Sequence, residues 1–181
     1  MLIEVALIQK YILFLGPPTL AIAASLFSLL FAGGVGSVVS GKWNSSKHFN
    51  SFSTSLIISI TIILYLLALP VLFDAFLGYS LLTRVLISFA SIFPLGFMMG
   101  IPFPTILRQV KREFENDAAW MWCINGAFSV LGSVLALVLA MSFGFNAVLM
   151  LGALTYLGIF LVGRKQPKER LETKNLRSGS D

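Results

Sequence analysis

Four polar residues lie within long apolar stretches and are the residues best suited to bind a ligand. Glu4, Gln9 and Tyr11 belong to the opening run MLIEVALIQKYILFLGPP, and Asn125 belongs to the later run WMWCINGAF. An ionisable side chain at the centre of a lipid bilayer costs at least about 2.5 kcal/mol, so it usually has a partner or a function. A carboxylate there can bind a cation or a proton, or it can pair with another protein group near the interface. We take all four as candidate ligand-binding residues and leave both interpretations of Glu4 open.

Helical spacing sorts the residues of the opening run by face. Glu4 and Tyr11 share one face with Ile8, whereas Gln9 and Lys10 lie on others. Glu4 and Lys10 are therefore poorly placed to pair within one helix. Lys10 can extend towards the lipid head groups instead.

Two other polar residues have simpler expected partners. Arg84 can reach the same face as Asp74 near the end of its apolar stretch, which predicts an interfacial ion pair. Asn125 lies one turn from Trp122 and is the neutral polar residue best placed for a hydrogen bond between helices.

The sequence lacks the groupings that catalysis or metal binding needs. No Ser/His/Asp set, His/Glu metal motif or pair of carboxylates is placed to converge at one depth. Cys123 is the single cysteine, so an intrachain disulfide is impossible, and neither Cys123 nor His48 has neighbours at metal-ligand spacing. We expect no catalytic residue, no metal and no cofactor in this chain.

Composition and apolar run length predict an all-α, polytopic transmembrane bundle. Of the 181 residues, 57% are hydrophobic and only 12% are charged, which a soluble domain could not accommodate. Runs near the 20 residues that a crossing helix needs occur at 19–40, 55–73, 85–104, 119–142 and 145–163. A shorter segment, 2–15, would reach only about 21 Å as a helix. We therefore expect about six segments within a transmembrane domain at 1–163.

Basic residues predict the orientation of the bundle. Eleven of the 13 Lys and Arg residues follow the second, fourth and sixth segments, and the connections DAFLGYS and SFGFN contain none. Positive charge marks the cytoplasmic side, so the alternation predicts cytoplasmic N- and C-termini. The same alternation explains the net charge of +5: the basic residues orient the helices in the membrane and contact lipid head groups, and they do not form a site for nucleic acid. The tail at 164–181, RKQPKERLETKNLRSGSD, is expected to be disordered and basic.

Small residues predict how the helices pack. Helices in lipid approach closely where Gly, Ala and Ser recur every three or four residues. The second segment has such a stripe at Ala21, Ser25, Ser28, Ala32, Gly36 and Ser40. The fifth has one at Asn125, Ser129, Gly132, Ser133, Ala136 and Ala140, and Gly152 and Tyr156 give the sixth a weaker version. Helix contact and the lining of a pathway are both open for these faces.

The stretch FPLGFMMGIPFP predicts a kinked helix. Pro94 removes a main-chain hydrogen bond within a span, and Gly96 and Gly100 allow another backbone to approach. Pro102 and Pro104 are expected to end the helix near the cytoplasmic face. Transporters use interrupted helices of this kind at binding sites, although a kink can also serve packing alone.

Three motifs together resemble the membrane segment of bacterial spermidine synthase-like multi-pass proteins. The first leads from EVALIQK to FLGPP and a helix with a glycine-rich end, and the second is the Gly-x-Pro-Phe-Pro stretch beginning at Gly100. The third is a Trp-x-x-Asn-Gly helix with a Phe-Gly-Phe turn, carried by Trp122, Asn125, Gly126, Phe143, Gly144 and Phe145. The resemblance covers about 2–40 and 94–160. It implies an aminopropyltransferase-like domain before this block, and no Gly-rich Rossmann loop is present here.

The resemblance implies a catalytically inert membrane module in the bacterial inner membrane. The module would anchor or serve an aminopropyltransferase-like domain or protein, and Met1 lies where that soluble domain would end. Any transferase activity would belong to that partner, and the polar candidates would contact a polyamine-like ligand. The alternative is a half-size secondary transporter of polyamines or other cations. Such a chain would act as a homo-oligomer, because six spans equal half of a twelve-span carrier.

Overall fold

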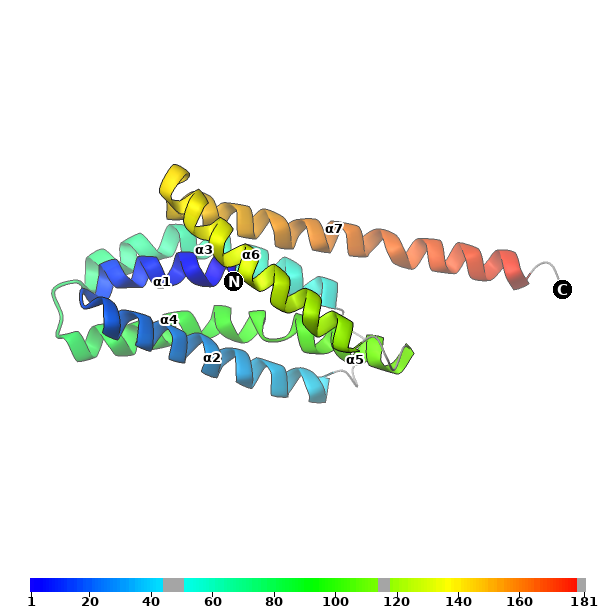
Figure 1. Cartoon of the computed structure of the whole chain (residues 1–181), viewed down its shortest axis with the longest axis horizontal. Helices are drawn as coiled ribbons and strands as arrows, with labels where there is room; N and C mark the ends of the chain where they lie inside the picture. The colour runs from blue at the N-terminus through cyan, green and yellow to red at the C-terminus, as the bar shows by residue number, and fades with distance from the viewer. Residues whose placement is uncertain (44–50, 114–117, 179–181) are drawn as a thin grey trace.

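The computed structural model describes residues 1–43, 51–113 and 118–178, and this part of the chain contains helices and no strands (Figure 1). The helices are α1 (Leu2–Leu15), α2 (Pro18–Trp43), α3 (Ser51–Phe76), α4 (Leu81–Met99), α5 (Pro102–Glu113), α6 (Ala118–Phe143) and α7 (Phe145–Ser178). The all-α prediction is confirmed.

Five helical stretches are long and apolar enough to cross a membrane. They are Pro18–Gly41, Thr54–Phe76, Leu81–Arg108, Ala119–Phe143 and Phe145–Val162. The 14-residue helix α1 is not among them, as its length of about 21 Å predicts. The chain is therefore a multi-pass helical protein of membrane character, with five such helices where six segments were expected.

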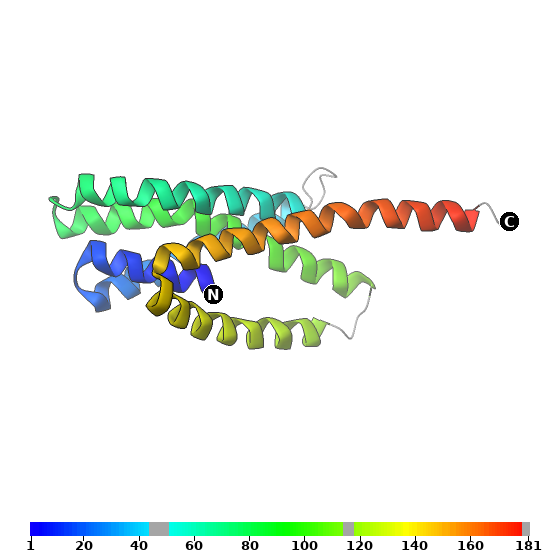
Figure 2. The same ribbon diagram turned by 90° about the horizontal axis from the view of Figure 1, so that it is seen from above.

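The short helix α1 forms the centre of the bundle. Residues along most of its length are at most 4% exposed: Ile3, Ala6, Leu7, Tyr11, Phe14 and Leu15. It packs against α2, α4, α6 and α7. Figures 1 and 2 show that it ends where α2 begins and that its N-terminus lies partway along the bundle. Helix α1 therefore starts inside the bundle and runs outward to the end at which α2 begins, opposite the basic segments.

The small-residue stripe of α2 is a packing face, as predicted. All six residues of that stripe are buried, and α2 and α4 form the most extensive helix pair. A Cβ atom added at Gly36 would overlap the carbonyl oxygen of Phe97, and one added at Gly100 would overlap that of Gly33. Backbone meets backbone at these positions, so only glycine fits.

The interruption after α4 differs in detail from the prediction. Helix α4 contains Pro94 in its interior and ends at Met99, before either of the later prolines. The Gly100 N–H donates to the carbonyl oxygens of Gly96 and Phe97 at 3.0 and 3.2 Å. Pro102 and Pro104 do not end a helix but lie in the first turn of α5, where an amide hydrogen has no helical acceptor anyway.

The basic segments gather at one end of the bundle. Helix α2 ends there after Lys42, and α5 carries Arg108, Lys111 and Arg112 to the same end (Figure 1, right). Helix α7 continues beyond the other helices to Ser178, whereas a disordered tail was expected from residue 164. Lys, Arg, Glu, Gln and Leu dominate this stretch, and their high helix propensity favours continuation.

Candidate functional site

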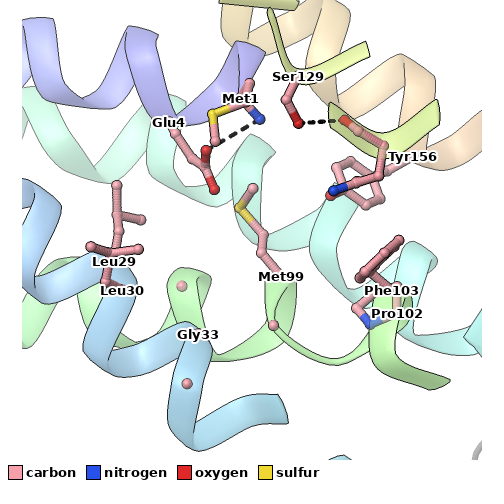
Figure 3. A pocket seen from close by; sticks show the side chains of 14 residues that line it. Met1, Glu4, Leu29, Leu30, Gly33, Met99, Pro102, Phe103, Ser129 and Tyr156 are labelled. Atoms are coloured by element: carbon pink, nitrogen blue, oxygen red, sulfur yellow. Dashed lines mark hydrogen bonds and ion pairs between the residues drawn. The ribbon is translucent and has the colours of Figure 1, made fainter. Parts of the chain in front are cut away.

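A half-open cavity of about 380 Å³ lies among six helices (Figure 3). Its wall includes Glu4 from α1, Gly33 from α2, Gly100 from the α4–α5 junction, Phe103 from α5, Asn125 from α6 and Tyr156 from α7. Two of the four candidate residues, Glu4 and Asn125, therefore meet in one space although they are distant in sequence.

The cavity lies near the middle of the membrane-spanning helices. Leu30 in its wall is 12 residues from Pro18 and 13 from Trp43 on α2, which corresponds to about 18 and 20 Å along the helix. Glu4 is 11 residues from the end of α1 at Leu15, or about 16 Å. Half of a hydrocarbon core is about 15 Å, so the Glu4 carboxylate is close to mid-depth if the bundle spans the bilayer.

Glu4 supplies the negative charge of this cavity. Its side chain is 28% exposed, and Oε2 lies 3.2 Å from the amino group of Met1 (Figure 3). This is the single ion pair within the described ranges. An acidic residue in a first helical turn also complements the helix dipole, which gives Glu4 a structural role. The ion pair uses one oxygen, and a carboxylate has about four acceptor positions, so capacity for a further donor remains.

Neutral polar groups surround the carboxylate. The Asn125 side chain is exposed at the cavity wall and, within the described residues, does not form the hydrogen bond between helices that its position predicts. Ser129 donates to the main-chain oxygen of Asn125 at 2.7 Å. Tyr156 shares the wall with Glu4. It belongs to a small-residue face for which the sequence left both helix contact and the lining of a pathway open.

The helix interruption adds main-chain acceptors to the wall. Met99 and Gly100 both line the cavity, at the C-terminal end of α4, where unpaired carbonyl groups carry partial negative charge. Pro104 has no amide hydrogen to donate to the Gly100 carbonyl, four residues earlier. Gly96 and Pro102 also line the space, whereas Pro94 and Pro104 lie outside its wall.

Tyr11 lies away from the cavity and serves packing. It is fully buried, its hydroxyl lies 2.7 Å from Ser91 Oγ on α4, and its ring contacts Phe73 edge-on at 5.2 Å. Tyr65 on α3 donates to the Ser91 main-chain oxygen. Together these bonds join α1, α3 and α4. Gln9 is partly exposed and lines no part of this cavity.

Arg84 secures the other end of α1. Its Nη2 donates to the carbonyl oxygen of Leu15 at 2.6 Å and its Nη1 to that of Leu77 at 3.3 Å. The guanidinium carbon lies 5.8 Å from the centre of the Phe14 ring. The predicted ion pair with Asp74 is therefore wrong, because the guanidinium group donates to the last carbonyl group of α1, at Leu15, and to the carbonyl group of Leu77 just after α3.

Metal chemistry has no identifiable site in the described residues. There, no three His, Cys, Asp or Glu side chains are grouped closely enough to hold an ion, and Cys123 is exposed. Comparison with protein-family models, curated proteins and solved structures found no match. The spermidine synthase-like resemblance therefore remains a hypothesis based on the quoted motifs.

Proposed function

We propose that this chain is a membrane module that binds an amine-bearing cation in the mid-depth cavity. The single observation that carries the proposal is the Glu4 carboxylate, which is the one acidic side chain in the wall of this cavity, among side chains that are otherwise neutral. Oε2 of Glu4 lies 3.2 Å from the Met1 nitrogen, so a nitrogen donor fits beside this carboxylate. Asn125, Tyr156 and the carbonyl groups at the end of α4 supply further acceptors for N–H donors.

The resemblance gives this binding site a context. In our proposal the basic end faces the bacterial cytoplasm, where an aminopropyltransferase-like domain or protein docks and exchanges a polyamine-like ligand with the module. The module itself is catalytically inert.

A half-size secondary transporter is the second candidate, and the interrupted α4–α5 stretch beside a mid-depth cavity favours it. Secondary transporters place their substrates at interrupted helices near the bilayer midplane. Such a chain would act as a dimer. Spermidine flux into liposomes that contain this chain alone supports transport, whereas binding without flux supports the anchoring module.

The first prediction concerns Glu4. Spermidine binding to the full chain in lipid nanodiscs, measured by equilibrium dialysis, should weaken about tenfold or more in Glu4→Gln, because a hydrogen bond to a charged group contributes roughly 1.5–3 kcal/mol. Gln9→Ala is the matched control, since Gln9 lies on the same helix outside the cavity wall. Equal affinity in wild type and Glu4→Gln would remove Glu4 from the site and overturn the proposal.

A further inference from the structure

The cavity has an open side between α2 and α6. Helix α2 packs against α1, α4 and α5, and α6 packs against α1, α5 and α7, without an extensive contact between α2 and α6. Leu30 on α2 is 74% exposed and Asn125 on α6 is exposed, although both line the cavity. At mid-depth, an opening between two helices faces lipid rather than water.

An aromatic pair lies beside the cavity on the side towards the basic end. The rings of Phe103 on α5 and Trp122 on α6 meet edge-on, with centroids 5.1 Å apart. Phe103 lines the cavity, so this contact joins α5 and α6 between the cavity and the basic end.

A second hollow continues from that opening along the outer surface of α2. It measures about 400 Å³ and is lined by Leu30, Phe31, Gly34, Val35, Val38 and Val39. We call it the α2 groove. It shares Leu30 and Gly34 with the cavity and follows the helix from residue 30 to residue 39, about 14 Å. Its side chains are all apolar, so it suits a hydrocarbon chain and no charged group.

We infer that the ligand is a cationic amphiphile that enters laterally from the bilayer. Its ammonium group lies beside Glu4, and its apolar chain follows the α2 groove. The inference rests on the proposed function and narrows its ligand class from free polyamines to amines attached to a hydrocarbon chain. An attached hydrocarbon chain adds apolar contacts in the α2 groove that a free polyamine cannot make.

Gly34 is the position at which this inference can be tested. It lies at the junction of the cavity and the α2 groove, and an added Cβ atom would meet nothing within 4 Å. A leucine there would obstruct the junction without disturbing the packing. Gly158 on α7 is the matched control, because a Cβ atom there also meets nothing within 4 Å and it lines neither hollow.

The experiment compares spermidine with N-dodecylspermidine, in which a dodecyl hydrocarbon chain is attached to the same polyamine. Binding to the full chain is measured in nanodiscs, with empty nanodiscs as the blank. We expect wild type to bind the dodecyl compound more tightly than spermidine. Gly34→Leu should weaken the binding of N-dodecylspermidine about tenfold, which corresponds to about 1.4 kcal/mol of binding free energy. Gly158→Leu should leave the affinity unchanged. Val38→Trp, which fills the groove away from the cavity, should act like Gly34→Leu.

The outcomes separate the two proposals. If Gly34→Leu and Val38→Trp change neither affinity while Glu4→Gln weakens spermidine binding, the amphiphile inference is overturned and the proposed function stands. If neither ligand's binding depends on Glu4, both are overturned.

Discussion

Glu4 differs from Arg84 and Tyr11 in having a charge that faces an open cavity. The guanidinium group of Arg84 is occupied by two carbonyl oxygens, and the hydroxyl of Tyr11 by Ser91. Glu4 contacts only the terminal ammonium among the described groups and lines a cavity. A carboxylate in this position can exchange one cationic partner for another, which a fully enclosed group cannot do.

Tyr11 provides the second prediction and separates packing from binding. Tyr11→Phe removes the hydroxyl that lies 2.7 Å from Ser91 Oγ. We expect the free energy of unfolding to fall by about 1 kcal/mol, the net contribution of one hydrogen bond, with unchanged spermidine affinity. Unfolding of the detergent-solubilised chain and dialysis on the same preparation measure both quantities. A loss of affinity matching that of Glu4→Gln would place Tyr11 in the site after all.

Residue type and helical spacing predicted part of the candidate site. A carboxylate and an amide in apolar runs were enough to single out Glu4 and Asn125. Tyr11 was chosen because it shares a face with Glu4, yet it lies two turns nearer the end of α1 and points into the contact with α4. Tyr156 was placed on a face for which helix contact and the lining of a pathway were both left open, and it was not chosen as a ligand-binding candidate. Which face of one helix meets which face of another depends on tertiary packing, and no local pattern carries that information.

At the scale of helices, the contact between α2 and the end of α4 fixes the cavity wall. Gly33, Gly96 and Gly100 belong both to this contact and to the wall. Close backbone approach thus holds the interrupted helix in place while leaving its carbonyl groups beside the cavity. The stripe on α2 and the close approach at Gly96 and Gly100 were predictable from small residues at regular steps. The start of α5 was not, because proline suits a first helical turn as well as a helix end.

Gly36 provides the third prediction. In Gly36→Ala the new methyl group would overlap the Phe97 carbonyl oxygen, whereas in Gly34→Ala it would meet nothing within 4 Å. Gly36→Ala should lower the free energy of unfolding by about 1–3 kcal/mol or more, as overpacking does. Gly34→Ala, two residues away on the same helix, should match wild type. Thermal unfolding in detergent compares the two, and equal midpoints would contradict the close packing of α2 on α4.

At the scale of the whole molecule, one end of the bundle carries the basic residues and the other does not, and a short buried helix lies at the centre. The alternation of basic connections predicted which helix ends lie together, because lysine and arginine mark one side of a membrane regardless of packing. It could not place α1, whose position is set by the burial of Leu7, Tyr11 and Phe14 among the surrounding helices. That position brings Glu4 to mid-depth, so the candidate site depends on a helix too short to cross.

The aromatic pair at the basic end provides the last prediction, which concerns access from water. If Phe103 and Trp122 obstruct that end, a cysteine at Ser129 in the cavity wall should react slowly with a membrane-impermeant maleimide in nanodiscs. The exposed native thiol is first removed by Cys123→Ser. Adding Phe103→Ala should speed the labelling of Ser129→Cys severalfold, because it deletes the ring that joins α5 to α6. Phe143→Ala, which removes an exposed ring at the opposite end of α6, should leave the rate unchanged. Fast labelling already present in the Cys123→Ser, Ser129→Cys chain would contradict an obstruction by this aromatic pair. It would mean that water, and free polyamines with it, reach the cavity directly.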